Sequence, residues 1–264
     1  MNVYIREMKA HRKSLIIWCI GMIALIGSGM GKFAGFSSSG QSMNELMAQM
    51  PKSLQAFLGV GSLDMSTASG FYGVLFLYVV LLATIHATML GATIISKEER
   101  DKTVEFLFVK PMPRKKIIGI KLLAALTQVG ILSTITWSAS LLIVGRYSSG
   151  ESINSDIGFT MIGMLILQVL FLVIGTAIAA STKKPGKAAT LATGVLLVTF
   201  ILSFAIDLSE KIEDLKYFTP FKYFEAKNVM DAGLELIFVG ISVVLIGVLA
   251  VSTFVLYNKR DLNV

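Results

Sequence analysis

The stretch KEERDKTVEFLFVKPMPRKK, residues 97–116, lies between two long apolar segments, Phe71–Ile95 and Ile117–Val144. Each segment exceeds the roughly 20 residues that a helix needs to cross the hydrocarbon core of a bilayer. The charged stretch therefore lies at a membrane surface. It also carries an apolar core, formed by Val104 and residues 106–109, which a solvated loop does not need. This combination predicts an element that docks onto another protein.

Apolar runs of membrane-spanning length recur along the whole chain of 264 residues. Outer-membrane strands are about 10 residues long and alternate in polarity, so these longer, non-alternating runs predict helices. Only 16% of the residues are charged, against about a quarter in a soluble domain. We therefore predict an all-α polytopic membrane protein, a single transmembrane domain over residues 1–264 that leaves no room for a soluble domain. The six expected spans are residues 14–31, 71–95, 117–144, 157–181, 188–206 and 234–257.

An even number of spans places both termini on the same side of the membrane. That side, which includes the 97–116 insert, holds 17 of the 24 basic residues, whereas 11 of the 17 acidic residues fall on the other side. Lysine and arginine accumulate in cytoplasmic loops, so both termini are predicted to be cytoplasmic. The net charge of +7 then reflects topology and attraction to anionic lipid rather than nucleic-acid binding.

The segments that flank the spans carry weaker patterns. Residues 1–13 are either a short interfacial helix that feeds the first span or a simple basic flank. The first span is expected to be retained, because its apolar run exceeds that of a signal peptide and no Ala-x-Ala follows it. Residues 32–68 and 207–233 are expected outside, the former as two short amphipathic helices, with Ser66 and Thr67 as candidate caps for the next helix. The aromatic residues of the second segment suit the membrane interface, and its acidic cluster a solvated face.

Few polar groups occur within the predicted spans. His86 is the only ionisable side chain placed deep in a span, and it is expected to hydrogen-bond to a neighbouring helix, since no carboxylate accompanies it to form a proton relay. Gln128 and Gln168 are expected to join helices rather than to bind substrate. The single cysteine, Cys19, excludes an intramolecular disulfide and is expected to be a small apolar filler.

Several kinds of chemistry are absent from the sequence. Without a GxxxxGK[ST] motif the chain cannot cradle ATP phosphates by itself. Two histidines and no HExxH motif exclude a zinc protease, and no GxSxG elbow is present. We therefore predict no catalytic residue, no metal site and no cofactor in this chain. The spans also lack the ionisable residues that couple an ion-driven transporter to its gradient. The energy for any transport is therefore expected to come from outside this chain.

The 97–116 insert is suited to receive that energy. From Lys97 the chain is predicted to continue as a helix with Val104, Leu107 and Phe108 on one face, until prolines 111 and 113 end it. An amphipathic helix held between two spans can transmit a push from a docked motor to both of them.

The run Glu99…Thr103-Val104-Glu105-Phe106-Leu107…Pro111…Arg114 resembles the signature of ABC-2 type transporter permeases. One departure is Lys102, which stands where the family usually has glycine. Residues 50–70 are similar to the family's first external region, residues 219–224 to its last external loop and residues 257–261 to its C-terminus. The resemblance covers nearly the whole chain, with the motifs in the family's order.

The resemblance implies a six-helix permease fold of the type V exporter kind, in a bacterial cell membrane. It implies a second permease subunit, the same or homologous, and two ABC ATP-binding subunits that bind ATP and magnesium on the cytoplasmic side. The residues expected to couple the chain to the ATPase are Glu98, Glu99, Arg100, Thr103, Glu105, Leu107, Pro111 and Arg114. The residues expected in an external cap over the transport route are Pro220, Phe221, Tyr223 and Phe224.

Two other functions remain open at this stage. An ion-coupled carrier would need no ATPase and would depend on His86 or on an outer acid such as Asp207. A membrane scaffold that recruits an ATPase would share the docking element but transport nothing. The sequence does not identify a substrate, because the apolar residues that would suit a hydrophobic cargo are also those that lipid requires.

Overall fold

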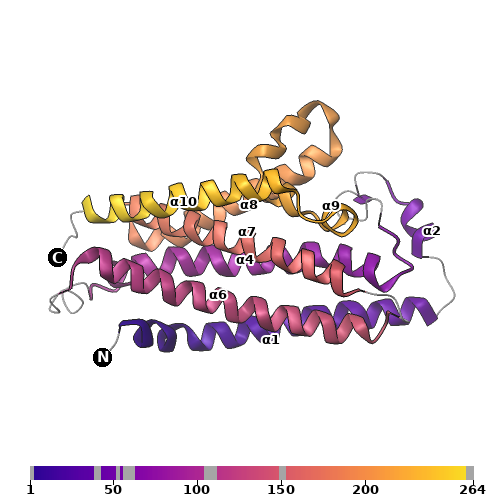
Figure 1. Ribbon diagram of the computed structural model, residues 1–264, viewed down its shortest axis with the longest axis horizontal. Coiled ribbons are helices and arrows are strands. Elements are labelled where there is room, and N and C mark those ends of the chain that lie inside the picture. The colour runs from indigo at the N-terminus through magenta and orange to yellow at the C-terminus, as the bar shows by residue number, and fades with distance from the viewer. Residues whose placement is uncertain are drawn as a thin grey trace.

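Six long helices run side by side in the computed structural model, which describes residues 3–38, 43–51, 54–55, 63–103, 112–148 and 153–259 (Figure 1). All six are long and apolar enough to cross a membrane, and the described residues contain no strand. The prediction of an all-α protein with six spans is therefore confirmed. The helices are α1 (Val3–Ser38), α4 (Ala68–Arg100), α6 (Arg114–Gly145), α7 (Asn154–Ser181), α8 (Ala188–Leu208) and α10 (Leu236–Lys259).

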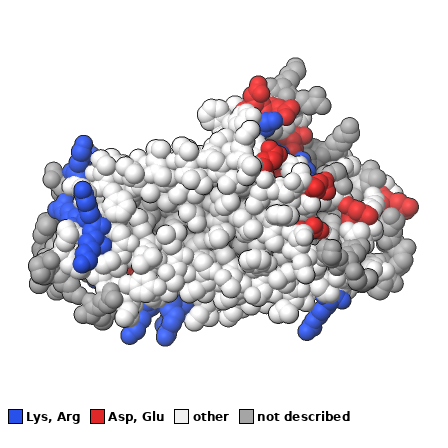
Figure 2. Space-filling model, in the orientation of Figure 1, with Lys and Arg blue, Asp and Glu red and all other residues white. Residues whose placement is uncertain are grey.

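The two ends of the bundle differ in structure and in charge. Both termini lie at one end, and the short helices α2 (Met43–Ala48) and α9 (Ala226–Ala232) lie at the other (Figure 1). Lysine and arginine side chains gather at the end with the termini, and aspartate and glutamate at the opposite end (Figure 2). The separation of charge that the sequence indicates is thus present in space. We refer to the two ends as the terminal end and the loop end.

Helices α4 and α7 form the centre of the bundle and pack closely against each other. A Cβ atom on Gly91 would lie 2.2 Å from the carbonyl oxygen of Leu172, and one on Gly175 would lie 2.4 Å from that of Thr88. Small residues let two membrane helices approach until their backbones touch, so dispersion contacts hold the pair where no hydrophobic effect operates. The pair is the spine against which the other helices pack.

Helices α8 and α10 lie at the periphery of the bundle and bury the smallest share of their length. Large apolar side chains such as Val198 on α8 and Val244 on α10 are about two-thirds exposed. In a bilayer an apolar outer surface is the ordinary one, because lipid replaces water as the solvent.

Three of the helices exceed the thickness of a bilayer by the largest margin. Residues 3–13 do not form a separate element, because α1 runs without a break from Val3 over 36 residues. Helix α4 has 33 residues and α6 has 32, so each is roughly 50 Å long, against about 30 Å of hydrocarbon. The first turns of α1 and α6 and the last turns of α4 can therefore extend past the lipid core at the terminal end.

The entry into α4 follows the predicted capping. Thr67 is the N-cap, and its Oγ1 accepts a hydrogen bond of 3.0 Å from the backbone N–H of Gly70. A Cβ atom on Gly70 would lie 2.0 Å from the carbonyl oxygen of Asp64, so the turn needs glycine there. Of the two amphipathic helices predicted in residues 32–68, α2 is described, and most of the second lies outside the described residues.

Candidate coupling site and external cavity

Helix α4 ends in a tight reversal of the chain at the terminal end. The N–H of Thr103 donates to the carbonyl oxygen of Glu98 at 2.8 Å, and the N–H of Lys102 donates to that of Glu99 at 3.4 Å. Lys102 has a φ of +54°. This pair of bonds around a left-handed residue is the Schellman motif, which satisfies the last carbonyl groups of a helix. The position that the family usually fills with glycine is therefore the one that requires a left-handed backbone.

The reversal corrects one expectation from the sequence. The prediction of a continuous helix from Lys97 to the prolines at 111 and 113 is wrong at residues 101–103, because the Schellman turn interrupts the helix there. Residues 104–111 lie outside the described part of the chain, and with them the predicted coupling residues Glu105, Leu107 and Pro111. The described chain resumes at residue 112, and α6 begins at Arg114 directly after Pro113.

A cluster of charged side chains is buried immediately beneath this turn. The Nζ atom of Lys121 on α6 donates to Glu98 Oε2 on α4 at 2.5 Å and to the carbonyl oxygen of Ile94 at 2.5 Å. The same Nζ lies 3.9 Å from Glu7 Oε1 on α1. Lys121 and Glu7 are each only 1% exposed. Three helices far apart in the sequence thus meet at one lysine.

Arg6 completes the cluster from α1. Its Nη2 donates to Glu98 Oε1 and to Glu7 Oε1, each at 2.8 Å. Two cations and two carboxylates give a formal charge of zero, so none of them is buried without a counter-charge. We call Arg6, Glu7, Glu98 and Lys121 the buried charge cluster. A nearby bond from the hydroxyl of Tyr4 to Thr127 Oγ1, at 3.1 Å, also joins α1 to α6.

The energetics of such a cluster explain what it can do. Transferring charges out of water costs several kcal/mol per ion, and their mutual attraction roughly repays that cost only while every partner is present. Removing one member leaves an uncompensated buried charge, which costs about 3–5 kcal/mol. The cluster therefore contributes little net stability but strongly favours one relative placement of the ends of α1, α4 and α6.

The predicted coupling residues that the structure describes lie around the turn, and only one of them enters the cluster. Glu98 is buried within it, whereas Arg100 and Thr103 are exposed. Arg100 pairs with Asp101 at 2.9 Å, and that hydrogen bond lowers the pKa of the Asp101 carboxyl. Glu99 and Arg114 are partly buried on either side of the undescribed segment.

Sequence reasoning did not identify Arg6, Glu7 and Lys121 as site residues. Lys121 was counted with the cytoplasmic surface charges that set the topology, yet it lies inside the predicted span 117–144 between Ile120 and Leu122. A lysine within an apolar run was the available signal, because buried ionisable groups in membrane helices seek partners. The sequence held no signal that the partners come from α1 and α4.

The intramembrane amides differ in their surroundings. Gln168 on α7 accepts a hydrogen bond of 2.5 Å from Ser133 Oγ on α6, and its Nε2 is 3.5 Å from the carbonyl oxygen of Ala83 on α4. It joins three helices, as expected. Gln128 on α6 is 1% exposed, yet its Oε1 and Nε2 find no hydrogen-bond partner among the described residues. The described residues therefore provide no bond through which Gln128 joins two helices, and that expectation stays a prediction.

His86 is buried on α4, but not through the expected hydrogen bond. Its Nδ1 has no hydrogen-bond partner among the described residues. Its ring instead packs on Trp18 of α1, with the two ring centroids 5.4 Å apart. Aromatic packing accounts for this side chain without a proton-relay role.

The residues of the predicted external cap are buried at the loop end. The short helix η3 (Pro220–Phe224) inserts its aromatic side chains among α7, α8 and α10. The Phe221 ring lies 5.2 Å from that of Phe171 and 5.0 Å from that of Phe200. Tyr223 stacks on Phe238 at 4.8 Å. These rings, with Pro220 and Phe224, are buried inside the protein. The expectation that they lie at the membrane interface is therefore wrong. Tyr217 and Phe218, on the short helix η2 (Glu210–Phe218), are exposed.

A second ionic group anchors η3 to α8 and α9. Lys222 Nζ contacts Asp207 Oδ1 at 2.5 Å and also pairs with Glu225. Lys227 on α9 lies 3.5 Å from Asp207 Oδ1 and 3.3 Å from Glu225 Oε2. We call Asp207, Lys222, Glu225 and Lys227 the outer charge group. Asp207, an acid proposed for an ion-coupled carrier, is thus already paired with two lysines.

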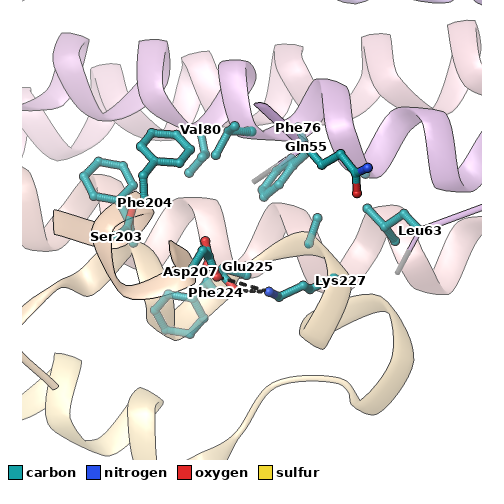
Figure 3. A pocket seen from close by; sticks show the side chains of 14 residues that line it. Gln55, Leu63, Phe76, Val80, Ser203, Phe204, Asp207, Phe224, Glu225 and Lys227 are labelled. Atoms are coloured by element: carbon teal, nitrogen blue, oxygen red, sulfur yellow. Dashed lines mark ion pairs between the residues drawn. The ribbon is translucent and has the colours of Figure 1, made fainter. Parts of the chain in front are cut away.

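A cavity of about 330 Å³ opens beside the outer charge group (Figure 3). Its apolar walls come from α4, α8, η3 and α9, and Asp207, Glu225 and Lys227 line its polar side. Ligand sites in proteins are concave, mostly apolar and furnished with a few placed polar groups. The cavity has this form, and the predicted cap residues Phe221 and Phe224 line it. Within the described residues, no group of three or more histidine, cysteine, aspartate or glutamate side chains could hold a metal ion.

Comparison with known families agrees with this architecture. A family described as "ABC-2 family transporter protein" matches residues 1–262. No curated protein matches the chain. Members of this family are the membrane subunits of ABC transporters; they lack an ATPase site of their own and associate with an ABC ATP-binding subunit. The chain therefore belongs to the ABC-2 family of transporter proteins, as a multi-pass membrane permease of an ABC transporter.

Proposed function

We propose that the chain is the permease of an ATP-driven exporter in a bacterial cell membrane. A second permease subunit, the same or a homologue, and two copies of the ATP-binding subunit would complete the transporter. ATP and magnesium would bind to those partners and not to this chain. Family membership supports the ATPase partner, and the basic terminal end supports its docking on the cytoplasmic side (Figure 2).

The buried charge cluster is the observation that carries the proposed coupling. The docking segment, residues 97–114, begins in the last turn of α4, which contains Glu98. Lys121 holds Glu98 from α6, the helix into which the segment returns. A push on the segment would therefore act on both helices, and on α1 through Glu7 and Arg6. Without the cluster, the same push could separate the ends of α1, α4 and α6 instead of moving them together.

The α4–α7 spine would carry this movement to the loop end. Its helices touch backbone to backbone at Gly91 and Gly175, so they would tilt as one body. The cavity at the loop end lies between α4 and α8, and tilting α4 would change its opening. Alternating access would then be a rocking of packed helices that ATP binding drives from the terminal end.

The direct test begins with the partner. The detergent-solubilised chain is isolated from its native membrane, and proteins that co-purify are identified by mass spectrometry. We expect a stoichiometric ATPase of roughly 25–35 kDa, the size of a one- or two-domain chain. An intact, monodisperse chain without any ATPase, and with transport that follows an ion gradient, would contradict the proposal.

Coupling is tested in nanodiscs that contain the chain and its ATPase. The double variant Glu98→Gln with Lys121→Met removes the central pair and leaves Arg6 with Glu7, so no buried charge loses its partner. We expect normal assembly and at least a tenfold loss of the ATPase stimulation that the permease gives. Stimulation equal to that of the unmodified chain would show that the cluster has no part in coupling.

A companion experiment addresses the docking segment itself. Glu105→Arg and Leu107→Asp are expected to abolish stimulated ATPase activity without preventing membrane insertion. If both variants bind and stimulate the ATPase normally, the docking assignment of residues 97–114 is wrong.

A further inference from the structure

The cavity at the loop end has walls that suit one kind of ligand. Phe76, Phe204, Phe221 and Phe224 come from α4, α8 and η3 and all line the cavity. Phe76, Phe204 and Phe224 are labelled in Figure 3. The faces of aromatic rings carry partial negative charge and attract cations within about 6 Å of the ring centre. Its volume of about 330 Å³ is at the small end of the range for ligand sites. The cavity therefore suits a small apolar body.

The polar side of the cavity holds two carboxylates, Asp207 and Glu225, and one lysine, Lys227. A second lysine, Lys222, does not line the cavity but pairs with the same two carboxylates, and the two lysines are not equivalent. Lys222 is nearly buried and makes close contacts with Asp207 and Glu225. Lys227 has a third of its side chain exposed, and its nitrogen stays 3.3 to 3.5 Å from the same carboxylates. Hydrogen bonds between charged partners are normally 2.7–2.9 Å long. Lys222 is thus fixed in the structure, whereas Lys227 is held loosely and can be replaced.

The surroundings of Lys227 specify the charge of a replacement. Burial lowers the pKa of this ammonium, but Glu225 and Asp207 outweigh it and raise the pKa above its ordinary value. The site therefore stabilises a cation at this point. An anion would have to approach two carboxylates at the acidic end of the molecule (Figure 2), and a neutral molecule could not compensate them.

We propose that this cavity binds an amphipathic organic cation, whose ammonium takes the place of Lys227 between Asp207 and Glu225 while its apolar body lies among the four phenylalanines. Lys227 then acts as a resident counter-ion that closes the empty site and moves into solvent when the ligand enters. The inference deepens the proposed export function, because the cavity would hold the cargo at the outer end of its route.

The test measures binding to the full chain in nanodiscs of zwitterionic lipid, by calorimetry and without any ATPase. The probes are benzyltriethylammonium, benzyl alcohol and benzylsulfonate, which share an aromatic body and differ in charge. We expect saturable binding of the cation only. Lys227→Met keeps the apolar stem and removes the competing charge, so it should tighten cation binding at least tenfold.

Loss-of-binding variants complete the set. Glu225→Gln removes half of the counter-charge and Phe204→Leu removes one aromatic wall, and each should weaken cation binding at least fivefold. Lys216→Met provides the matched control, because Lys216 pairs with Glu213 outside the cavity and its loss should change nothing. A gain of affinity in Lys227→Met cannot arise from misfolding. This variant therefore tests directly whether Lys227 occupies the cation site.

Three results would overturn the inference: unchanged or weaker cation binding in Lys227→Met, equal binding of benzylsulfonate, or no binding of the cation at all. These outcomes are separate from the fate of the transport proposal. A chain that binds the cation but has no ATPase partner would retain the site and lose the exporter function. A chain that stimulates its ATPase but binds no cation would retain the exporter function and lose the proposed cation site.

Discussion

Lys102 occupies a left-handed backbone conformation, with a φ of +54°, that disfavours every residue with a Cβ atom. For an L-residue this region costs roughly 1–2 kcal/mol, and glycine avoids the cost because it has no side chain. The chain tolerates lysine here because the Schellman bonds to Glu98 and Glu99 fix the turn. Glu98 takes part in both features, because its carbonyl oxygen accepts a bond of the turn and its carboxylate accepts one from Lys121.

Replacing Lys102 by glycine should therefore stabilise the protein. We expect Lys102→Gly to raise the free energy of unfolding by about 1 kcal/mol, less the entropy that glycine adds to the unfolded chain. Lys102→Ala removes the charge but keeps the Cβ atom, and it should bring no such gain. Unfolding in mixed micelles, followed by tryptophan fluorescence, measures both variants. Equal effects of glycine and alanine would assign the change to charge and not to the backbone.

The buried charge cluster predicts a strong asymmetry between lysines of the same helix. Lys121→Met should lower the free energy of unfolding by about 3 kcal/mol, because Glu98 and Glu7 lose a buried counter-charge. Lys116→Met changes an exposed lysine near the start of α6 and should stay within about 0.5 kcal/mol. Denaturation of both variants in the same micelles gives the comparison. A small effect at Lys121 would mean that water already solvates the cluster.

At the scale of elements, the α4–α7 pair explains why some glycines matter and others do not. Gly91 and Gly175 face a carbonyl group of the partner helix, whereas nothing lies within 4 Å of a Cβ atom on Gly194 or Gly130. The sequence shows many glycines in the spans and a GxxxG at residues 27 and 31. No neighbouring atom lies within 4 Å of a Cβ atom on Gly31, so that motif marks no close contact within this chain.

Alanine at these glycines should give effects of opposite sign. Gly175→Ala forces the backbones of α4 and α7 apart and should cost about 3 kcal/mol or more. Gly194→Ala has free space on the exposed side of α8 and should stabilise the helix by about 0.5–1 kcal/mol. Thermal unfolding in detergent measures both. If Gly175→Ala were neutral, the backbone contact with Thr88 would not exist in the membrane.

At the scale of the whole molecule, the separation of charge between the two ends sets the orientation in the membrane. Exposed basic side chains gather at the terminal end and exposed acidic side chains at the loop end (Figure 2), and the Lys/Arg-rich side of a membrane protein is expected in the cytoplasm. In the proposed orientation, the buried charge cluster and the cavity lie on opposite sides of the membrane. This arrangement requires a movement of whole helices if one site is to control the other.

Cysteine labelling tests this orientation. In a Cys19→Ser background, Asp214→Cys on η2 should react with a membrane-impermeant maleimide in intact cells. Lys184→Cys, in the turn between α7 and α8, should react only after the cells are permeabilised. Both positions are exposed, so accessibility within the protein does not limit either reaction. The reverse pattern of labelling would invert the topology.

The six spans, their helical form and the end at which the charges gather can all be predicted from runs of neighbouring residues. This is possible because a bilayer imposes a minimum apolar length and satisfies no backbone polar group, which are local demands that each segment must meet alone. The cap at Thr67 and the family signature are equally local, and both are readable from neighbouring residues. The ends of α1, α4 and α6 lie outside the predicted spans, because apolarity does not mark a helix where it extends past the lipid core.

Which polar groups share a site depends on how the helices pack against one another. Glu7, Glu98 and Lys121 are separated by 91 and 23 positions in the sequence, and nothing in their local pattern relates them. The same holds for Asp207 and Lys227, which meet across the cavity. Burying a charge is tolerable only beside its counter-charge, so the packing of the helices, and not the sequence of any one of them, selects these partners.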